Sequence, residues 1–422
     1  MLLLAFLCFF ILVLLGVPIA FSMGLGAIIS ILSNDLPLAL ISQRLFSGIN
    51  SFSLLAIPFF MLAGELMENG GISRRLIHLS KCLVGHFRGG LGMIDISTSV
   101  IFAGVSGSAA ADTAAVGSIM IPTMKKNGYP AGLTAVLQSV AGSLGPIIPP
   151  SLTAIIFASL TGLSIKDLFL AGILPGIAIA IGLVLVTYFY AKKYNLGRDQ
   201  KASRAILCKA FKEASSALFM PVIIVGGILV GFFTPTEAGA VAVLYAIAVG
   251  IYYKELTFEK FKHSILNAAA MTAMCTLIIS GATILSWIIA FTRLPDLIIG
   301  FLTSITDNPY MILLLLVAFL LFIGMFIETI AATIIVAPIL MPVAYQYGID
   351  PIQFAIIMIV VLVYAGVTPP VGGVLFITMG IANVKLQETL KYLVPYLGVI
   401  FIVVLLMILF PSISLMIPNM FR

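Results

Sequence analysis

Charged residues are scarce in this chain: Asp, Glu, Lys and Arg make up only 9% of its 422 residues. Hydrophobic residues make up 61%, and the mean hydropathy is +1.22. A soluble domain carries about a quarter charged residues, so this composition excludes an ordinary soluble fold. Apolar runs of about 20 residues, long enough to cross a bilayer, recur from residue 2 to residue 421. We therefore expect an all-α protein that crosses the membrane many times.

The chain also lacks the residue patterns of several other functional classes. Its four cysteines are scattered without a CxxC pair, which argues against a disulfide framework or a zinc site. No HExxH, GxSxG or phosphate-loop motif occurs in a suitable context, so we expect neither an enzyme nor a nucleotide site. The net charge of +6 comes from basic loops, which orient membrane proteins, and does not indicate nucleic-acid binding.

The basic loops predict how the chain is oriented. The loop 69–90 carries four Lys or Arg residues, and the loop 192–213 carries seven against two acids. Lys and Arg concentrate on the cytoplasmic side of membranes, so both loops are expected there. Residues 2–33 are expected to form one long span, bent at Gly16-Val-Pro18 and retained rather than cleaved as a signal peptide.

A stretch of small residues stands out against this apolar background. Residues 102–122 are mostly Gly, Ala, Ser and Thr, with a single carboxylate, Asp112. Only 34 residues separate Gly90 from Lys125, which is short for two crossings and a turn. A re-entrant hairpin with its tip at Ser106-Gly107-Ser108 fits this length better; two short tilted crossings are the alternative.

The next apolar segment, 129–163, is interrupted by Gly142, Gly145 and the pair Pro149-Pro150. Proline removes a helix hydrogen bond and glycine weakens the helix, so this segment predicts a discontinuous helix. Broken helices at membrane depth expose carbonyl groups that need a protein partner or a wet cavity. Transporters use such breaks to bind ions and anionic substrates.

The second half of the chain repeats these landmarks. Asp112-Thr113 precedes Pro122 by ten residues, and Glu328-Thr329 precedes Pro338 by ten. A Gly and Pro-Pro break recurs at residues 366–370. Since the charges place the ends of the first hairpin inside and those of the second outside, the repeat is inverted, as in many secondary transporters. A second hairpin is expected in 306–347, with two short spans as the alternative.

Five carboxylates are expected within the apolar segments, where they are costly. They are Glu65, Asp95, Asp112, Glu237 and Glu328. They could attract coupling ions, relay protons or gate, or they could cap the amides of half-helices. Both interpretations stay open for Asp112 and Glu328, whereas structural roles are favoured for the other three.

The two breaks also predict oxygen-rich sites for sodium, a hard cation. Backbone carbonyls and Ser or Thr hydroxyls at the ends of half-helices suit it, and about two ions are expected, one in each half of the chain. The first set comprises Ser106, Ser108, Gly145, Ile148 and Pro149, and the second comprises Gly324, Gly366, Thr368 and Val371. Substrate is expected at the hairpin tips, near Ser106, Gly107, Ser108, Asp112, Glu328 and Thr329. Tight packing of small residues is the structural alternative for any single glycine.

The sequence resembles the large membrane subunit of tripartite ATP-independent periplasmic (TRAP) transporters along essentially its whole length. The resemblance rests on five segments: residues 57–65, 104–112, 145–151, 231–238 and 366–370. It implies an elevator-type fold, a sodium-driven symporter of the bacterial inner membrane, a small membrane subunit and a periplasmic binding protein. It also implies a carboxylate substrate such as a C4-dicarboxylate or sialic acid.

On this basis the chain divides into five parts. They are N-terminal scaffold helices (1–89), a first transport repeat (90–191), a basic loop with central scaffold and arm helices (192–305), a second transport repeat (306–384) and a C-terminal scaffold helix (385–422). The expected function is sodium-coupled uptake of an organic acid. The alternatives are a stand-alone transporter of the wider elevator superfamily that needs no binding protein, and a channel.

Overall fold

The computed structural model describes residues 2–34 and 36–421, and within them every regular element is helical. Seven helices are long and apolar enough to cross a membrane, or eight if α15 (Leu294–Ile305) and α16 (Pro309–Gly324) are counted as one span bent by 120°. The all-α polytopic fold expected from the composition is therefore confirmed.

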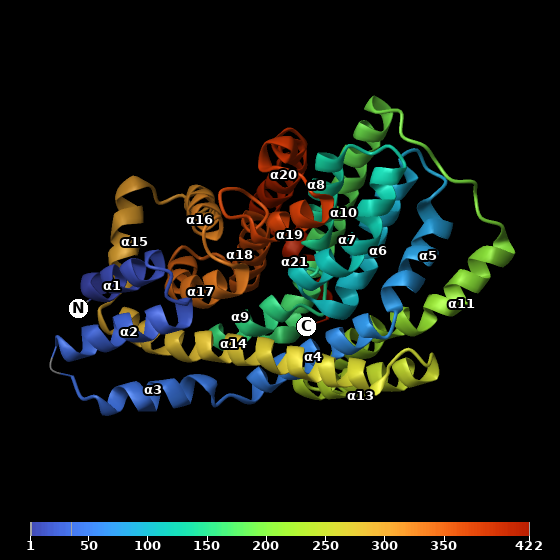
Figure 1. Cartoon of the computed structure of the whole chain (residues 1–422). Helices are drawn as coiled ribbons and strands as arrows, with labels where there is room; N and C mark the ends of the chain where they lie inside the picture. Colours follow the sequence, from blue (N-terminus) through green and yellow to red (C-terminus); the bar gives the residue numbers. More distant parts are fainter. Residues whose placement is uncertain (1, 35, 422) are drawn as a thin grey trace.

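One layer of helices, of which α14 is the longest, runs along the lower side of the molecule in Figure 1. α14 packs against α2, α3 and α4, and α13 packs against α4. The members of this layer are α2 (Ile19–Leu32), α3 (Ala39–Ile49), the 3-10 helix η1 (Phe52–Leu55), α4 (Ala56–Asn69), α13 (Pro235–Tyr252) and α14 (Phe258–Phe291). At 1.5 Å per residue, α14 is about 50 Å long, more than the hydrocarbon core needs.

The N-terminal segment differs from the single long span expected over 2–33. The chain forms two helices, α1 (Leu2–Leu14) and α2, which pack against each other. Gly16 adopts a left-handed conformation with φ of 85°, and Pro18 precedes the first turn of α2, so the chain reverses between them. The contact is close: a Cβ on Gly26 would lie 2.7 Å from the carbonyl oxygen of Ala5.

The carboxylate of Glu237 caps the N-terminus of α13. Thr234 and Glu237 form a capping box, in which the Thr234 N–H donates to Oε2 of Glu237 at 2.8 Å. This satisfies amides that the helix itself leaves unpaired. The structural role favoured for Glu237 is therefore confirmed.

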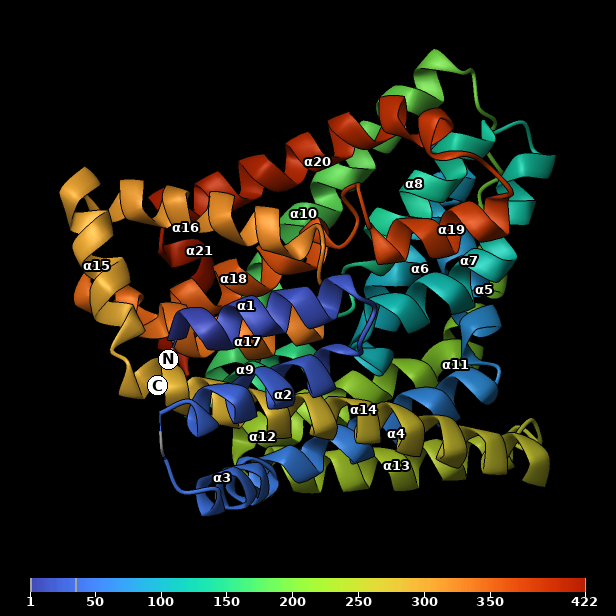
Figure 2. The same ribbon diagram turned by 60° about the vertical axis from the view of Figure 1, so that its left-hand side comes forward.

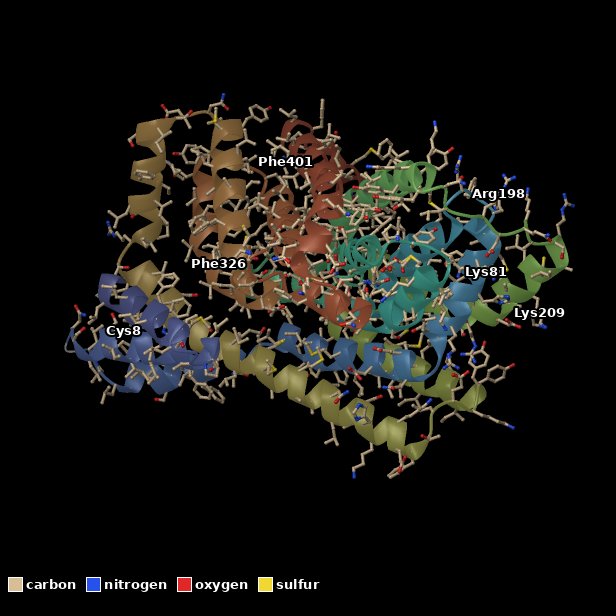
Figure 3. The ribbon with its side chains drawn as sticks, turned by 45° about the horizontal axis from the view of Figure 1, so that its top comes forward. Cys8, Lys81, Arg198, Lys209, Phe326 and Phe401 are labelled. Atoms are coloured by element: carbon tan, nitrogen blue, oxygen red, sulfur yellow. The ribbon has the colours of Figure 1, made fainter. Side chains whose placement is uncertain are left out.

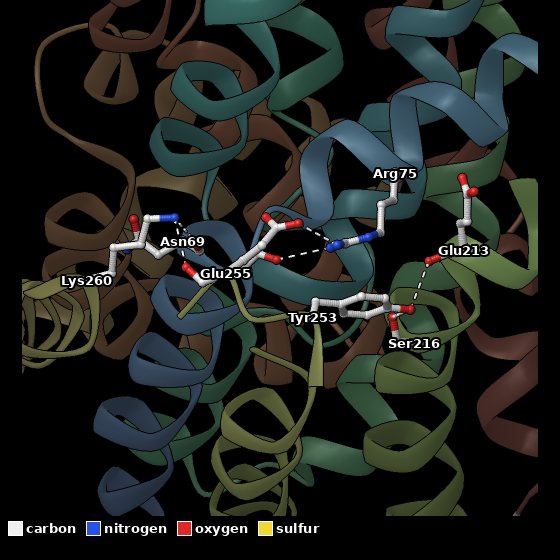
Figure 4. A network of polar contacts seen from close by, with 8 residues as sticks. Asn69, Arg75, Glu213, Ser216, Tyr253, Glu255 and Lys260 are labelled. Atoms are coloured by element: carbon white, nitrogen blue, oxygen red, sulfur yellow. Dashed lines mark hydrogen bonds and ion pairs between the residues drawn. The ribbon is translucent and has the colours of Figure 1, made fainter. Parts of the chain in front are cut away.

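Two helices with basic residues connect this layer to the rest of the protein. They are α5 (Ile72–Val84) and α11 (Arg204–Pro221), which pack together; α11 continues through a π-helical turn, Val222–Gly226, into α12 (Gly227–Val230). The start of α5 is fixed by Arg75, which donates to Glu255 at 2.5 Å and lies 3.7 Å from the centroid of the Tyr253 ring (Figure 4). Lys260 Nζ donates to the carbonyls of Asn69 and Glu255 in the same network.

The remaining helices fall into two similar series. The first is α6 (Gly90–Ser106), α7 (Ala109–Lys126), α8 (Ala131–Gly142), α9 (Leu152–Thr161) and α10 (Ile165–Lys193). The second is α16, α17 (Thr329–Gln346), α18 (Pro351–Ala365), α19 (Gly373–Ala382) and α20 (Leu386–Leu409), followed by α21 (Ser412–Met420). The pairs α8–α9 and α18–α19 are the two discontinuous helices that the Gly and Pro-Pro landmarks predicted.

The match between the two series extends beyond the predicted landmarks. Both Pro-Pro peptide bonds, Pro149-Pro150 and Pro369-Pro370, are cis. Pro175 inside α10 and Pro395 inside α20 each follow the second proline of the preceding pair by 25 residues. The last helix of the second series, α20, is thus the counterpart of α10.

The two series exchange their short half-helices. α9 of the first series packs against α17 of the second, while α19 of the second packs against α7 and α8 of the first. Figure 2 shows α19 lying over these two helices. A hydrogen bond of 2.5 Å from Lys125 Nζ to the carbonyl of Ala382 joins the ends of α7 and α19. The half-helix that follows each break therefore packs against helices of the other half.

Candidate functional site

The turn between α6 and α7 forms the first tip. Gly107 has a left-handed φ of 65°, and a Cβ at this position would lie 2.5 Å from the carbonyl oxygen of Pro150. Ser108 caps α7, because its side chain accepts from the Ala111 N–H at 3.5 Å. The tip is thereby turned sharply and held against the first Pro-Pro break.

Asp112 lies directly behind this tip in the first turn of α7. The Ser106 hydroxyl donates to its Oδ1, and the Ser108 N–H donates to the Ser106 Oγ at 3.2 Å. Asp112 is fully buried, and its Oδ2 has no hydrogen-bond partner among the described residues. That oxygen faces the first break, since a Cβ on Gly145 would lie 2.4 Å from it.

The second tip lies between α16 and α17. Glu328 caps α17: its Oε2 accepts from the N–H groups of Ile330 at 2.9 Å and Ala331 at 3.2 Å. A carboxylate at a helix N-terminus also interacts favourably with the helix dipole. The capping interpretation of Glu328 is therefore confirmed, and its effect on ions stays a prediction.

The break between α18 and α19 lies against the second tip, just as the break between α8 and α9 lies against the first tip. The Thr329 hydroxyl donates to the carbonyl of Leu362 at 3.4 Å and lies 3.4 Å from where a Cβ on Gly366 would be. The Val371 N–H donates to the carbonyl of Met325 at 3.3 Å. The first half has the same relationship, because Thr113 lies against Gly142. In both halves, a carboxyl-Thr pair therefore sits opposite a glycine of the broken helix.

A cavity of about 280 Å³ lies between the two tips and the two breaks. This volume is close to the lower end of the range for ligand pockets, about 300 Å³, so the cavity suits a ligand no larger than a small organic acid. Several residues of the predicted sites line this cavity: Gly107, Ser108, Gly324, Glu328, Thr329, Gly366 and Val371. Residues that are distant in the sequence thus meet at one site.

Six predicted residues lie outside the lining of this cavity. Ser106, Asp112 and Gly145 form the buried cluster behind the first tip, and Ile148 and Pro149 belong to the break that follows. Thr368 lines a different, apolar cavity of about 230 Å³ with Met325 and Phe401, and its hydroxyl donates to the carbonyl of Tyr364 at 2.9 Å.

Several lining residues were not predicted. Thr153, at the start of α9, supplies a buried hydroxyl next to the first tip. The apolar part of the wall includes Phe326, Ile327, Val374 and Ile377; Phe326 is labelled in Figure 3. Thr153 lies two residues after Ser151, and a hydroxyl so close to the Pro-Pro pair was a signal for it; the apolar residues resemble those of any membrane helix.

The cavity has an acidic character. Glu328 is its one charged lining residue, with no Lys or Arg among the described residues that line it. Asp112 lies just behind the first tip, and none of the three ion pairs found in the described part of the chain involves either carboxylate. The negative charge of Glu328 disfavours a bound anion unless cations or protons offset it.

Comparisons with known proteins match this chain to one family along nearly its whole length. Residues 6–413 match the family model described as tripartite ATP-independent periplasmic transporter, DctM component. The chain is 41% identical over 406 residues to a putative TRAP transporter large permease protein of Haemophilus influenzae, covering 96% of each chain. It is 38% identical over 408 residues to the sialic acid TRAP transporter large permease protein SiaM of Vibrio cholerae, again covering 96% of each.

A solved structure supports the fold independently. The crystal structure of the YdaH transporter of Alcanivorax borkumensis superposes with a TM-score of 0.67 over 89% of both chains, at 15% sequence identity. This likeness extends to the elevator-type fold alone. From the family match and the identity to its relatives, the chain belongs to the DctM component family, the large permeases of TRAP transporters.

Proposed function

We propose that this permease takes up an organic acid across the bacterial inner membrane, driven by sodium ions. The cavity between the two tips carries this proposal. Its lining offers Glu328 and no basic side chain among the described residues, so cations are needed to neutralise a bound carboxylate. Sodium suits the available ligands, which are hydroxyl, carboxylate and backbone carbonyl oxygens.

About two sodium ions would bind, one beside each break. The first would use oxygens of Ser106, Ser108, Gly145, Ile148 and Pro149, with the unpaired Oδ2 of Asp112 close by. The second would use Gly324, Gly366, Thr368 and Val371. Thr368 would contribute its hydroxyl oxygen, whose lone pairs stay free for a cation while the O–H donates to the carbonyl of Tyr364.

Movement would follow an elevator mechanism. The helix pairs α6–α7 and α16–α17 would be re-entrant hairpins, and together with the two discontinuous helices (90–191 and 306–384) they would move as a transport unit. The N-terminal and central helices (1–89 and 192–305) and the C-terminal segment 385–422 would hold it in the membrane. The exchange of α9 and α19 between the halves supports this unit, since packing across the halves would couple their movement.

The partners would be a small TRAP membrane subunit and a periplasmic substrate-binding protein. The carboxylate would be sialic acid, for which the Vibrio cholerae relative is named, or a C4-dicarboxylate, for which a Rhodobacter capsulatus relative is named. The cavity wall is largely apolar, so the binding protein would contribute most of the selectivity.

Uptake into proteoliposomes tests the proposal. The vesicles would contain this chain and its small subunit, with the cognate binding protein outside, and labelled sialic acid and succinate would serve as probes. We expect uptake to need an inward sodium gradient and the binding protein. Uptake by this chain alone would favour the stand-alone transporter, and downhill flux without sodium would favour a channel.

A further inference from the structure

Asp95 is a second fully buried carboxyl of the first series, and the proposed sodium sites do not use it. It lies on α6, which packs against α4, α5, α7, α8, α10 and α11. The ion pairs found among the described residues do not include it. The titratable groups that interact with Asp95 are the phenols Tyr129 and Tyr396, and no charged side chain of the surrounding helices does so in the described part of the chain.

The direct partner of Asp95 is the amide of Gln138 on α8. With its nitrogen turned toward the carboxyl, the Gln138 amide lies 2.5 Å from Oδ1 and 3.3 Å from Oδ2. In the opposite orientation its oxygen faces the carboxyl, and a protonated Asp95 would then donate to it. A separation of 2.5 Å suits a strong hydrogen bond and leaves no room for a metal ion between the two atoms.

The balance of charge favours the protonated form. An ionised carboxylate in a low-dielectric interior costs several kcal/mol unless a positive charge and several hydrogen bonds offset it. One neutral amide does not supply that compensation. A proton removes the charge and keeps the hydrogen bond to Gln138, whichever way the amide is turned.

A route to the aqueous surface starts on the same face of α6. Gly92, three residues before Asp95, donates its N–H to the Tyr129 hydroxyl at 3.3 Å. Tyr129 is 5% exposed and lines a small polar cavity of about 110 Å³. The other lining residues are Gly90, Leu91, Asn127, Gly197, Arg198 and Asp199. This cavity opens beside Arg198, at the end of the molecule where basic residues gather in Figure 3.

Tyr129 is suited to pass protons without ionising. Burial raises its pKa to about 12, so the phenol keeps its proton at neutral pH. The Tyr129 hydroxyl accepts from the Gly92 N–H and lies one helical turn from Asp95, so a bridging water would complete the relay. Hydronium in the polar cavity would protonate the Tyr129 oxygen, the phenol's own proton would move to the bridging water, and a proton of that water would move to Asp95. Water, an unchanged tyrosine and a neutral carboxyl result, and the charge balances.

We propose that Asp95 and Gln138 form a proton-binding site inside the first series, separate from the sodium sites, and that Tyr129 connects it to the basic end of the molecule. Proton occupancy of this site would make the packing of α6 against α8 sensitive to the pH on the side of the membrane where the basic end of the molecule lies. The inference does not depend on sodium coupling or on the identity of the substrate.

Infrared difference spectroscopy of the full chain with its small subunit in lipid nanodiscs tests the proposal, with the solvent proton or deuteron as the probe. We expect the wild-type spectrum at neutral pH to contain a protonated-carboxyl carbonyl band that Asp95→Asn removes. Asp307→Asn, on an exposed loop, is the matched control and should leave the band unchanged.

The Tyr129→Phe variant tests the route. It should keep the Asp95 band but slow its shift on transfer to heavy water about tenfold, as expected from losing one hydrogen-bonding relay group. A wild-type spectrum without an Asp95 carbonyl band at neutral pH would overturn the site. An unchanged exchange rate in Tyr129→Phe would overturn the route, and a band whose titration shifts with sodium concentration would overturn its separation from the sodium sites.

Discussion

The hydroxyl of Ser106 donates to Oδ1 of Asp112, which ties the last residue of α6 to the first turn of α7. The hydrogen bond fixes the carboxyl group so that its Oδ2 is directed at Gly145, in the break between α8 and α9. The first tip and the first break are thus organised around one buried carboxylate.

Gly145→Ala should impair transport. The new Cβ would lie 2.4 Å from Asp112 Oδ2 and 3.2 Å from the Ser108 carbonyl carbon, so the tip would have to move. Overpacking of this kind costs about 1–3 kcal/mol, and uptake should fall at least about tenfold. Initial uptake rates in proteoliposomes measure this. Gly380→Ala, where nothing lies within 4 Å, is the matched control; equal rates in both variants would contradict the prediction.

Asp112→Asn should weaken sodium activation of uptake. The amide keeps the size of the carboxyl but loses its charge, so the sodium ion proposed beside the first break would lose an electrostatic partner. A loss of about 1.4 kcal/mol would raise the sodium concentration for half-maximal uptake about tenfold. Asp307→Asn should leave it unchanged. An unaltered sodium response in Asp112→Asn would show that the carboxyl is structural only.

Substitutions of Glu328 separate its two roles. Glu328→Ala removes the cap of α17 and should destabilise the protein by about 0.5–2 kcal/mol, seen as a lower thermal unfolding temperature. Glu328→Gln keeps an acceptor oxygen for Ile330 and Ala331 but removes the charge. It should unfold near the wild-type temperature and need more sodium for uptake. A wild-type sodium response in Glu328→Gln would leave capping as its only role.

Arg75 and Glu255 should be energetically coupled, because Arg75 is half-buried and also stacks on Tyr253. A double-mutant cycle with Arg75→Met and Glu255→Gln should give about 0.5–1 kcal/mol, the upper range for partly exposed pairs. The more exposed pair Lys81 and Asp199, at 3.5 Å, should give less. Equal coupling in the two cycles would mean that Arg75 does not specifically fix the start of α5.

Much of the fold could be predicted because helix breakers act locally. Pro149-Pro150 and Pro369-Pro370 interrupt their helices through missing amides and steric clash, whatever surrounds them. The reversal at Gly16 was mistaken for a bend because its direction depends on how α1 packs against α2. The sequence also gave no sign that Thr368 and Gly366, two residues apart, line different cavities.

Composition and backbone chemistry were enough to predict the membrane environment, the helix breaks and the paired carboxyl-Thr motifs, because they act on neighbouring residues. The exchange of α9 and α19 between the halves, and the meeting of Ser108 and Glu328 at one cavity, became visible in the packed fold. The same packing also determines that Asp95 meets Gln138 rather than a cation. These relationships join residues far apart in the chain, and they result from how whole helices pack, which local patterns do not specify.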